Sequence, residues 1–196
     1  MFRILLVLVV AAAVVAELAL PSFVEARVER TVREHTDGVA SVDASTGDFP
    51  FLPDLLAAGV VDRLDVSLRE IDGREIAIGT VALRLEGIQL DRSRLLAGTV
   101  EVVDIAAGQV LVELEEAAIS DALGVPVDLD PAMLELAGRA LEVVAPDGAS
   151  LDLPVPEDLL PCRPDVEVVE SVVRLTCEFD EVPGVLLRAI DDAARG

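Results

Sequence analysis

The spacing of hydrophobic positions changes near Gly38. Before it, apolar residues from Phe23 to His35 recur at helical intervals, and Ser22 with Glu25 three residues later fits a capping box. After Gly38, apolar and polar residues alternate, which is typical of half-buried strands. The pattern therefore predicts a long N-terminal helix followed by a run of strands.

Alternation predicts strands for most of the remaining chain. Leu64, Val66 and Leu68 alternate with charged and small polar residues, so this stretch should rest one face on a core. The connections are short, which favours antiparallel neighbours. The other strands are predicted at residues 39–43, 74–86, 99–105, 109–113, 125–130, 139–145 and 149–153, and in a hairpin that turns near Glu170-Ser171.

Within the strand at 74–86 the apolar parity shifts. Ile76 and Ile78 share one parity, whereas Val81 and the apolar residues after it share the other. An extra residue in one strand moves all later side chains to the opposite face. We therefore predict a β-bulge near Gly79-Thr80.

Two further helices complete the predicted fold. Glu115 to Leu123 has helical character and is closed by Gly124, and Pro183-Gly184 opens a last helix that reaches Ile190. The order lacks the strand-helix alternation that builds parallel sheets. We predict one α+β domain over residues 21–196, with the long N-terminal helix packed in a curved, mostly antiparallel sheet, a short middle helix and a C-terminal helix.

Residues 1–20 are predicted to be a signal peptide or an N-terminal membrane anchor. Arg3 precedes an apolar run from Ile4 to Ala16. That run is shorter than the roughly 20 residues that a membrane-spanning helix needs, and it suits the hydrophobic region of a signal peptide. Cleavage after Ala16 and retention as an anchor both stay open. Either one predicts an exported domain in the cell envelope or periplasmic space, free or anchored to the outer face of the plasma membrane.

The two cysteines agree with export. Cys162 and Cys177 flank the predicted hairpin, whose strands would bring them near each other. A disulfide, which suits an oxidising compartment, is the simplest interpretation, and two buried free thiols or a metal pair are the alternatives. Because His35 is the single histidine, the cysteines make a poor metal site, and we predict no bound metal.

Composition narrows the class of function. The chain has 37 Asp and Glu against 15 Lys and Arg, a net charge of −22, which argues against nucleic-acid binding and against anionic membrane surfaces. With 53% hydrophobic residues and a mean hydropathy of +0.54, the chain should fold. It has five Phe and no Tyr or Trp. The resulting aliphatic walls suit flexible acyl chains, or they simply fill a core.

Motifs that carry catalysis are missing from the sequence. His35 has no nucleophile-elbow motif to partner it, and there is no glycine-rich phosphate loop. The carboxylates are spread along the outer faces of predicted strands, as solvated charges would be. A hydrolase that uses carboxylates stays an alternative, although no particular carboxylate stands out. We predict that the chain is not an enzyme and uses no cofactor.

Several short motifs of the chain have counterparts in a known family. They are the helix rich in Arg and Glu, Phe49-Pro50-Phe51-Leu52 followed by Leu55 and Gly59, the strand from Val60 to Leu68, Leu83-Leu85-Gly87, Gly98-Thr99-Val100, and the helix near Ala117-Ala118-Ile119 and Leu123. Together these motifs resemble the LmeA-like phospholipid-binding family. That family consists of exported envelope proteins of high-GC Gram-positive bacteria. It is similar to tubular lipid-binding proteins, in which a curved antiparallel sheet holds a long helix.

The resemblance implies an exported protein that binds phospholipid, and that could also transfer it, by holding acyl chains in an aliphatic groove between sheet and helix. Its partners would be phospholipid and a membrane surface, met transiently or through the N-terminal segment. A non-enzymatic structural or protein-interaction module of the envelope is the alternative, with protein partners unknown. The residues predicted to contact lipid are Val28, Val32, Phe49, Phe51, Leu52, Leu55, Leu56, Leu64, Val66, Leu68, Ile76, Ile78, Val100 and Val102.

The roles of two groups of residues can each be interpreted in two ways. The apolar insert around Phe49 and Phe51 fits a lip that docks on a membrane and, equally, a plug that closes the end of the sheet. Arg27, Arg30 or Arg33 could pair with a lipid phosphate, but a solvated helix face is the favoured interpretation.

Overall fold

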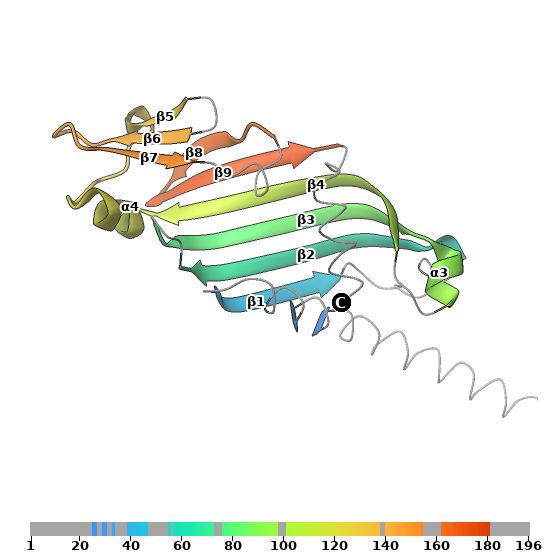
Figure 1. The fold of residues 1–196 in the computed structure, drawn as a ribbon. Coiled ribbons are helices and arrows are strands. Elements are labelled where there is room, and N and C mark those ends of the chain that lie inside the picture. Colours follow the sequence, from blue (N-terminus) through green and yellow to red (C-terminus); the bar gives the residue numbers. More distant parts are fainter. Residues whose placement is uncertain are drawn as a thin grey trace, which may run out of the picture.

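A computed structural model gives the structure of the chain (Figure 1). The structure describes residues 25–26, 29–30, 33, 39–46, 55, 57–72, 76–97, 101–137, 140–154 and 162–180. The predicted signal peptide or anchor at 1–20 and the predicted C-terminal helix at 183–190 lie outside these residues.

Six strands form one curved antiparallel sheet in the order β1-β2-β3-β4-β9-β8 (Figure 1). Strands that follow each other in sequence pair directly from β1 to β4, and the hairpin of β8 and β9 then adds to the free side of β4. The strands are β1 (Val39–Thr46), β2 (Val60–Ile71), β3 (Ile78–Leu90), β4 (Val102–Glu115), β8 (Asp165–Val169) and β9 (Val172–Phe179).

A second, smaller antiparallel sheet has the order β5-β6-β7, formed by Leu134–Ala137, Ala140–Val144 and Ser150–Pro154. Helix α3 (Arg92–Leu96) joins β3 to β4, and helix α4 (Glu116–Leu123) follows β4.

Asp91 caps α3 by accepting hydrogen bonds from the Ser93 hydroxyl and backbone, and these bonds lower the pKa of its carboxyl. Among the described residues, no helix is both long enough and apolar enough to cross a bilayer.

The predicted α+β class is wrong. The described residues are mostly strands in two antiparallel sheets, and the α-helices with defined bounds among them are the short α3 and α4. No long N-terminal helix is found there. Helical periodicity shows which residues can share a face, but tertiary packing decides what covers a sheet. In the described part of the chain, β6, β7 and α4 pack against the apolar face of the large sheet at its α4 end.

Several local predictions can be compared with the structure. The middle helix is confirmed as α4, with Gly124 at φ 72° as its C-cap. The strands predicted at 99–105 and 109–113 are one continuous strand, β4. The strand predicted at 125–130 is wrong. Val127 and Leu129 are buried alternately, but their backbone N–H groups donate to the side chains of Ser120 and Glu116 on α4 instead of to a neighbouring strand.

The predicted bulge near Gly79-Thr80 is wrong, although the parity shift behind it is present. The pairing register of β2 and β3 runs unbroken, so neither strand holds an extra residue. Glu70 has a φ of 53°, in the left-handed region that reorients the side chains after it. Beyond it, Ile71 and its partner Ile78 pack against the same core as Leu68.

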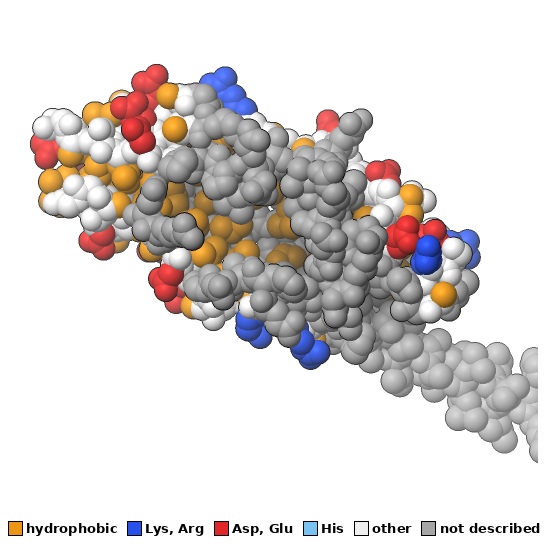
Figure 2. All heavy atoms as spheres, viewed as in Figure 1, with side chains coloured by type: hydrophobic (Ala, Val, Ile, Leu, Met, Phe, Trp, Pro, Cys, Tyr) orange, Lys and Arg blue, Asp and Glu red, His pale blue; other side chains and the backbone are white. Residues whose placement is uncertain are grey.

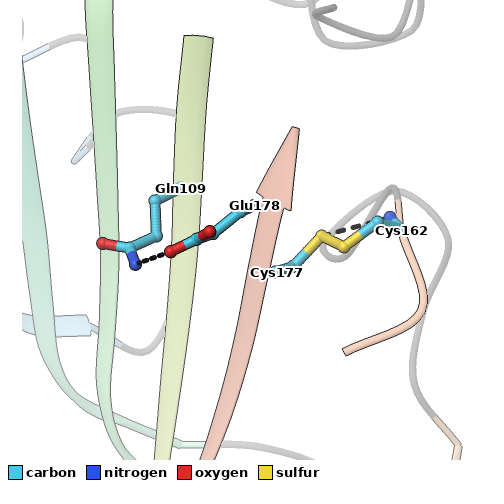
Figure 3. The surroundings of a disulfide bond; sticks show 4 residues. All are labelled: Gln109, Cys162, Cys177 and Glu178. Atoms are coloured by element: carbon cyan, nitrogen blue, oxygen red, sulfur yellow. Dashed lines mark hydrogen bonds between the residues drawn. A yellow bond between two sulfur atoms is a disulfide. The ribbon is translucent and has the colours of Figure 1, made fainter. Parts of the chain in front are cut away.

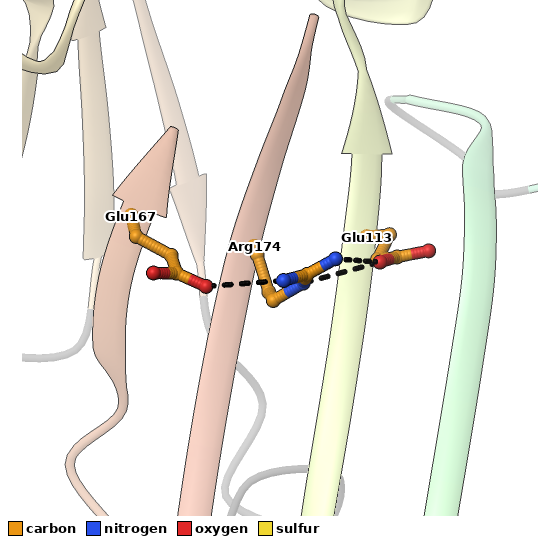
Figure 4. Close-up of polar contacts among 3 residues, drawn as sticks. All are labelled: Glu113, Glu167 and Arg174. Atoms are coloured by element: carbon orange, nitrogen blue, oxygen red, sulfur yellow. Dashed lines mark hydrogen bonds and ion pairs between the residues drawn. The ribbon is translucent and has the colours of Figure 1, made fainter. Parts of the chain in front are cut away.

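The outer face of the large sheet carries charged side chains that pair across strands. Arg174 on β9 lies 3.0 Å from Glu113 on β4 and 3.2 Å from Glu167 on β8 (Figure 4). Arg84 on β3 pairs with Asp65 on β2 at 2.6 Å. The hydrogen bonds that both arginines donate to these carboxylates raise their pKa, so the arginines stay charged. An antiparallel sheet with one solvated face buries the other, so the core lies on the inner face.

The buried hydrophobic side chains form two clusters. The larger cluster joins the inner face of the sheet to α4, β6 and β7, and Ile119, Leu141 and Val143 within it have no exposed surface. The smaller cluster lies toward α3 and consists of Leu55, Leu85, Ile88, Leu90 and Ile105. The larger cluster consists of Val81, Val110, Val112, Leu114, Ile119, Val127, Leu129, Leu141, Val143, Ala145, Leu153, Val173, Leu175 and Cys177.

Backbone N–H groups at the β1 edge of the sheet donate hydrogen bonds to side chains of N-terminal residues. The backbone N–H of Thr46 donates to Glu25 Oε1 at 3.0 Å, and that of Ala44 donates to Glu29 Oε1 at 3.3 Å. Unpaired edge groups invite pairing with another chain, so these two carboxylates protect the edge.

We expect the double substitution Glu25→Ala and Glu29→Ala to lower the free energy of unfolding by about 1–3 kcal/mol, because two part-buried N–H groups lose their acceptors. Urea unfolding measures the loss, and light scattering measures any new self-association. Glu25→Gln with Glu29→Gln is the matched control, since the amide oxygen can still accept. Equal stability of the Ala and Gln variants would contradict the role of these bonds.

Candidate functional site

The middle of the inner face carries two uninterrupted rows of uncharged residues. Residues paired directly across an antiparallel sheet share a face, so the register assigns the rows. In Figure 2, hydrophobic side chains gather in the middle of the face turned to the viewer. From β2 across to β9, the rows are Leu64, Leu85, Gly108 and Phe179, and beside them Val66, Leu83, Val110 and Cys177.

Three side chains in these rows remain partly exposed, namely Leu64, Leu83 and Phe179. Leu83 and Phe179 pack against both the larger and the smaller cluster, and Leu64 packs against the smaller one. We name these three residues the central strip. Because the other apolar side chains of the two rows are buried, the central strip is where an apolar ligand could gain contact with this face.

Phe179 lies across β4 rather than beside it. A Cβ atom built on Gly108 would overlap the ring of Phe179, and it would lie 3.1 Å from Leu85 Cδ2. Gly108 is the direct partner of Phe179, so the missing side chain provides the space that the ring fills. The glycine is therefore required by a close approach of the aromatic ring to the backbone.

The chemistry of this face is apolar. Neither row contains a charged residue, and the ion pairs of the large sheet lie on the outer face. Within the described ranges, no buried side-chain nitrogen or oxygen lacks a hydrogen-bond partner. In the same residues, no group of three or more His, Cys, Asp or Glu could hold a metal ion. Such a surface can bind apolar groups by excluding water.

The predicted disulfide between Cys162 and Cys177 is confirmed (Figure 3). The hairpin turns at Glu170 and Ser171 as predicted, with Val169 paired to Val172. Cys177 is fully buried in the larger cluster. Its neighbour Glu178 points to the other face, where it accepts a hydrogen bond from Gln109 Nε2 at 3.0 Å (Figure 3). The disulfide thus fixes the strand whose last residue is Phe179.

Half of the predicted lipid contacts lie among the described residues. Leu64 and Val66 stand in the two middle rows, and Leu68 lies in the next row toward α4. Four others lie outside the rows: Leu55 is a buried member of the smaller cluster, Val102 packs against that cluster, and Ile76 and Ile78 pack against the larger one. The other predicted contacts, Val28, Val32, Phe49, Phe51, Leu52, Leu56 and Val100, lie outside the described residues.

Sequence reasoning did not select Leu83 or Phe179 as lipid contacts. Alternation along the strand places Leu83 on the same face as Val81 and Leu85, so the sequence could have indicated this contact. Phe179 stands two residues after Cys177, and this spacing puts both side chains on one face of a strand. Its approach to Gly108 depends on the pairing of β4 with β9, which no local pattern reveals.

Together the fold and the site define a β-sheet protein with one ion-paired, solvated face and one aliphatic face. The sequence model of the LmeA-like phospholipid-binding family matches residues 15–195, and the chain belongs to this family. Comparisons with curated proteins and with solved structures find no match in either set. The family resemblance drawn from the short motifs is confirmed, and membership supports lipid binding.

Proposed function

We propose that the chain binds phospholipid by laying the acyl chains on the inner face of the large sheet, over the central strip. The observation that carries this proposal is the pair of uncharged rows, in which the partly exposed Leu83 and Phe179 contact both clusters. Acyl chains covering this surface would remove apolar area from water, which is worth about 25 cal/mol for each Å².

We further propose that the protein is exported to the cell envelope and carries phospholipid between membranes. Membership of the phospholipid-binding family supports the ligand class. The Cys162–Cys177 disulfide supports an oxidising compartment, where such bonds persist. The apolar run at 4–16 supports export. The net charge of −22 disfavours anionic bilayers, so contact with a membrane would use a local apolar surface.

Mass spectrometry of organic extracts tests the ligand class. We expect protein purified from its own host to release a phospholipid in a fixed molar ratio, and the head group can be read from the same spectrum. The protein denatured and washed before extraction is the control. A folded protein that carries no lipid and takes up none from phosphatidylcholine vesicles would contradict the proposal and favour a protein-interaction module.

Two neighbouring residues on β3 test the place of binding. Leu83 lies on the inner face, and Ala82 lies on the outer face opposite Ser67 and Leu111. With a polarity-sensitive fluorophore on Leu83→Cys, we expect phosphatidylcholine vesicles to shift the emission to the blue. The same label on Ala82→Cys should report no shift. Equal responses at both positions would place the lipid elsewhere.

A further inference from the structure

We infer that Phe179 determines which acyl-chain lengths the site accepts, an inference that rests on the proposed function. The ring lies over the backbone of β4 at Gly108, in the row that runs from Leu64 across the sheet. It is also one of the side chains that contact both clusters. Phe179 is therefore placed where an apolar chain lying along this row would end.

An apolar chain on the inner face must lie across the strands, because the face is covered at both ends. Toward α4, the face is covered by β6, whose residues Leu141 and Val143 have no exposed surface, and by β7, whose Leu153 is buried. Toward α3, the residues of the smaller cluster are buried as well. The three partly exposed side chains of the central strip lie between the two clusters, so a path over them crosses the strands from Leu64 on β2 past Leu83 on β3 to Phe179 on β9. A chain lying there spans three strand spacings, about 14 Å.

The ring shortens this path. Because Gly108 has no side chain, the row would have open backbone over β4 if the ring were absent, and the ring fills that space. A smaller side chain at position 179 would free about one strand spacing, about 4.8 Å, for additional methylene groups. Each further methylene buried raises affinity about fourfold. A larger side chain at 179 would cover more of the row and remove contacts.

Binding of phosphatidylcholines that differ only in chain length, from short to long, tests the inference. We expect Phe179→Ala to move the preferred length toward longer chains and Phe179→Trp to move it toward shorter ones, with Phe179→Leu between Ala and the wild type. Thr176→Ala, on the outer face of the same strand, is the matched control. Circular dichroism and the unfolding midpoint establish that each variant is folded.

The outcomes separate this inference from the proposed function. Wild-type protein that binds none of these lipids would overturn both. A wild type that binds lipid, while folded Phe179→Leu and Phe179→Trp keep its preferred chain length, would overturn the role of Phe179 alone. Phe179→Leu keeps an apolar side chain against both clusters, so this result does not depend on the stability of the alanine variant.

Discussion

Reduction of the Cys162–Cys177 disulfide should lower the free energy of unfolding by about 3 kcal/mol. The two cysteines are separated by fifteen residues in the sequence, and in the chain-entropy model a bond that closes a loop of this length stabilises by about that amount, because it restricts the unfolded chain. Cys177 is fully buried, and Cys162 holds the segment before the edge strand β8 against it. Loss of the bond therefore frees the edge hairpin without removing any core atom.

Urea unfolding of oxidised and reduced protein, at the same pH and temperature, measures the difference. Titration of thiols in denaturant confirms the redox state of each sample. Far-ultraviolet circular dichroism should show that reduced protein is still folded in the absence of urea. Identical midpoints and slopes for the two forms would mean that packing of the β8–β9 hairpin, and not the covalent link, holds this edge of the sheet.

Local pattern predicted the sheet well wherever one face is buried and the other solvated. Leu64, Val66 and Leu68 share the inner face as their alternation indicates, and the hairpin turn with its disulfide was predicted from Cys162 and Cys177. In these cases the alternation of apolar and polar residues along a strand, and the short loop between the two cysteines, are enough to predict the structure. The direction of the face is then fixed, since a slip by one residue would expose every apolar side chain.

The errors arise where a tertiary partner overrides a local pattern. Val127 and Leu129 alternate in burial like a strand, yet α4 side chains accept their backbone N–H groups. The helical spacing of the N-terminal residues predicted a helix packed in the sheet, whereas in the described part of the chain β6, β7 and α4 pack against the α4 end of the inner face. Propensity and periodicity cannot choose between such partners, because the choice depends on contacts distant in sequence.

The central strip shows the same limit within the site. The family resemblance and the aliphatic composition predicted the kind of ligand, and two of the named contacts, Leu64 and Val66, fall in the middle rows. Phe179 was missed because its position over Gly108 arises from the pairing of β4 with β9, whose registered residues lie far apart in the sequence.

A carboxylate introduced on the central strip should lower phospholipid affinity more than about tenfold. In Leu83→Asp, acyl chains that cover the strip would also cover a charge, and desolvating an unpaired carboxylate costs several kcal/mol, while 1.4 kcal/mol is already a factor of ten. Leu83 is partly exposed before any ligand binds, so the free protein should tolerate the change. Titration with phosphatidylcholine vesicles, or the ratio of co-purified lipid to protein, measures the loss.

Ala82→Asp is the matched control, since it adds the same charge one residue away on the outer face, beside Ser67 and Leu111. The net charge of both variants is equal, so general repulsion from a membrane affects them alike. Leu83→Ser offers a milder change if the aspartate disturbs folding, and it should lower affinity less than the charge does. Equal lipid loading of Leu83→Asp and Ala82→Asp, with both proteins folded, would show that acyl chains do not lie on this face.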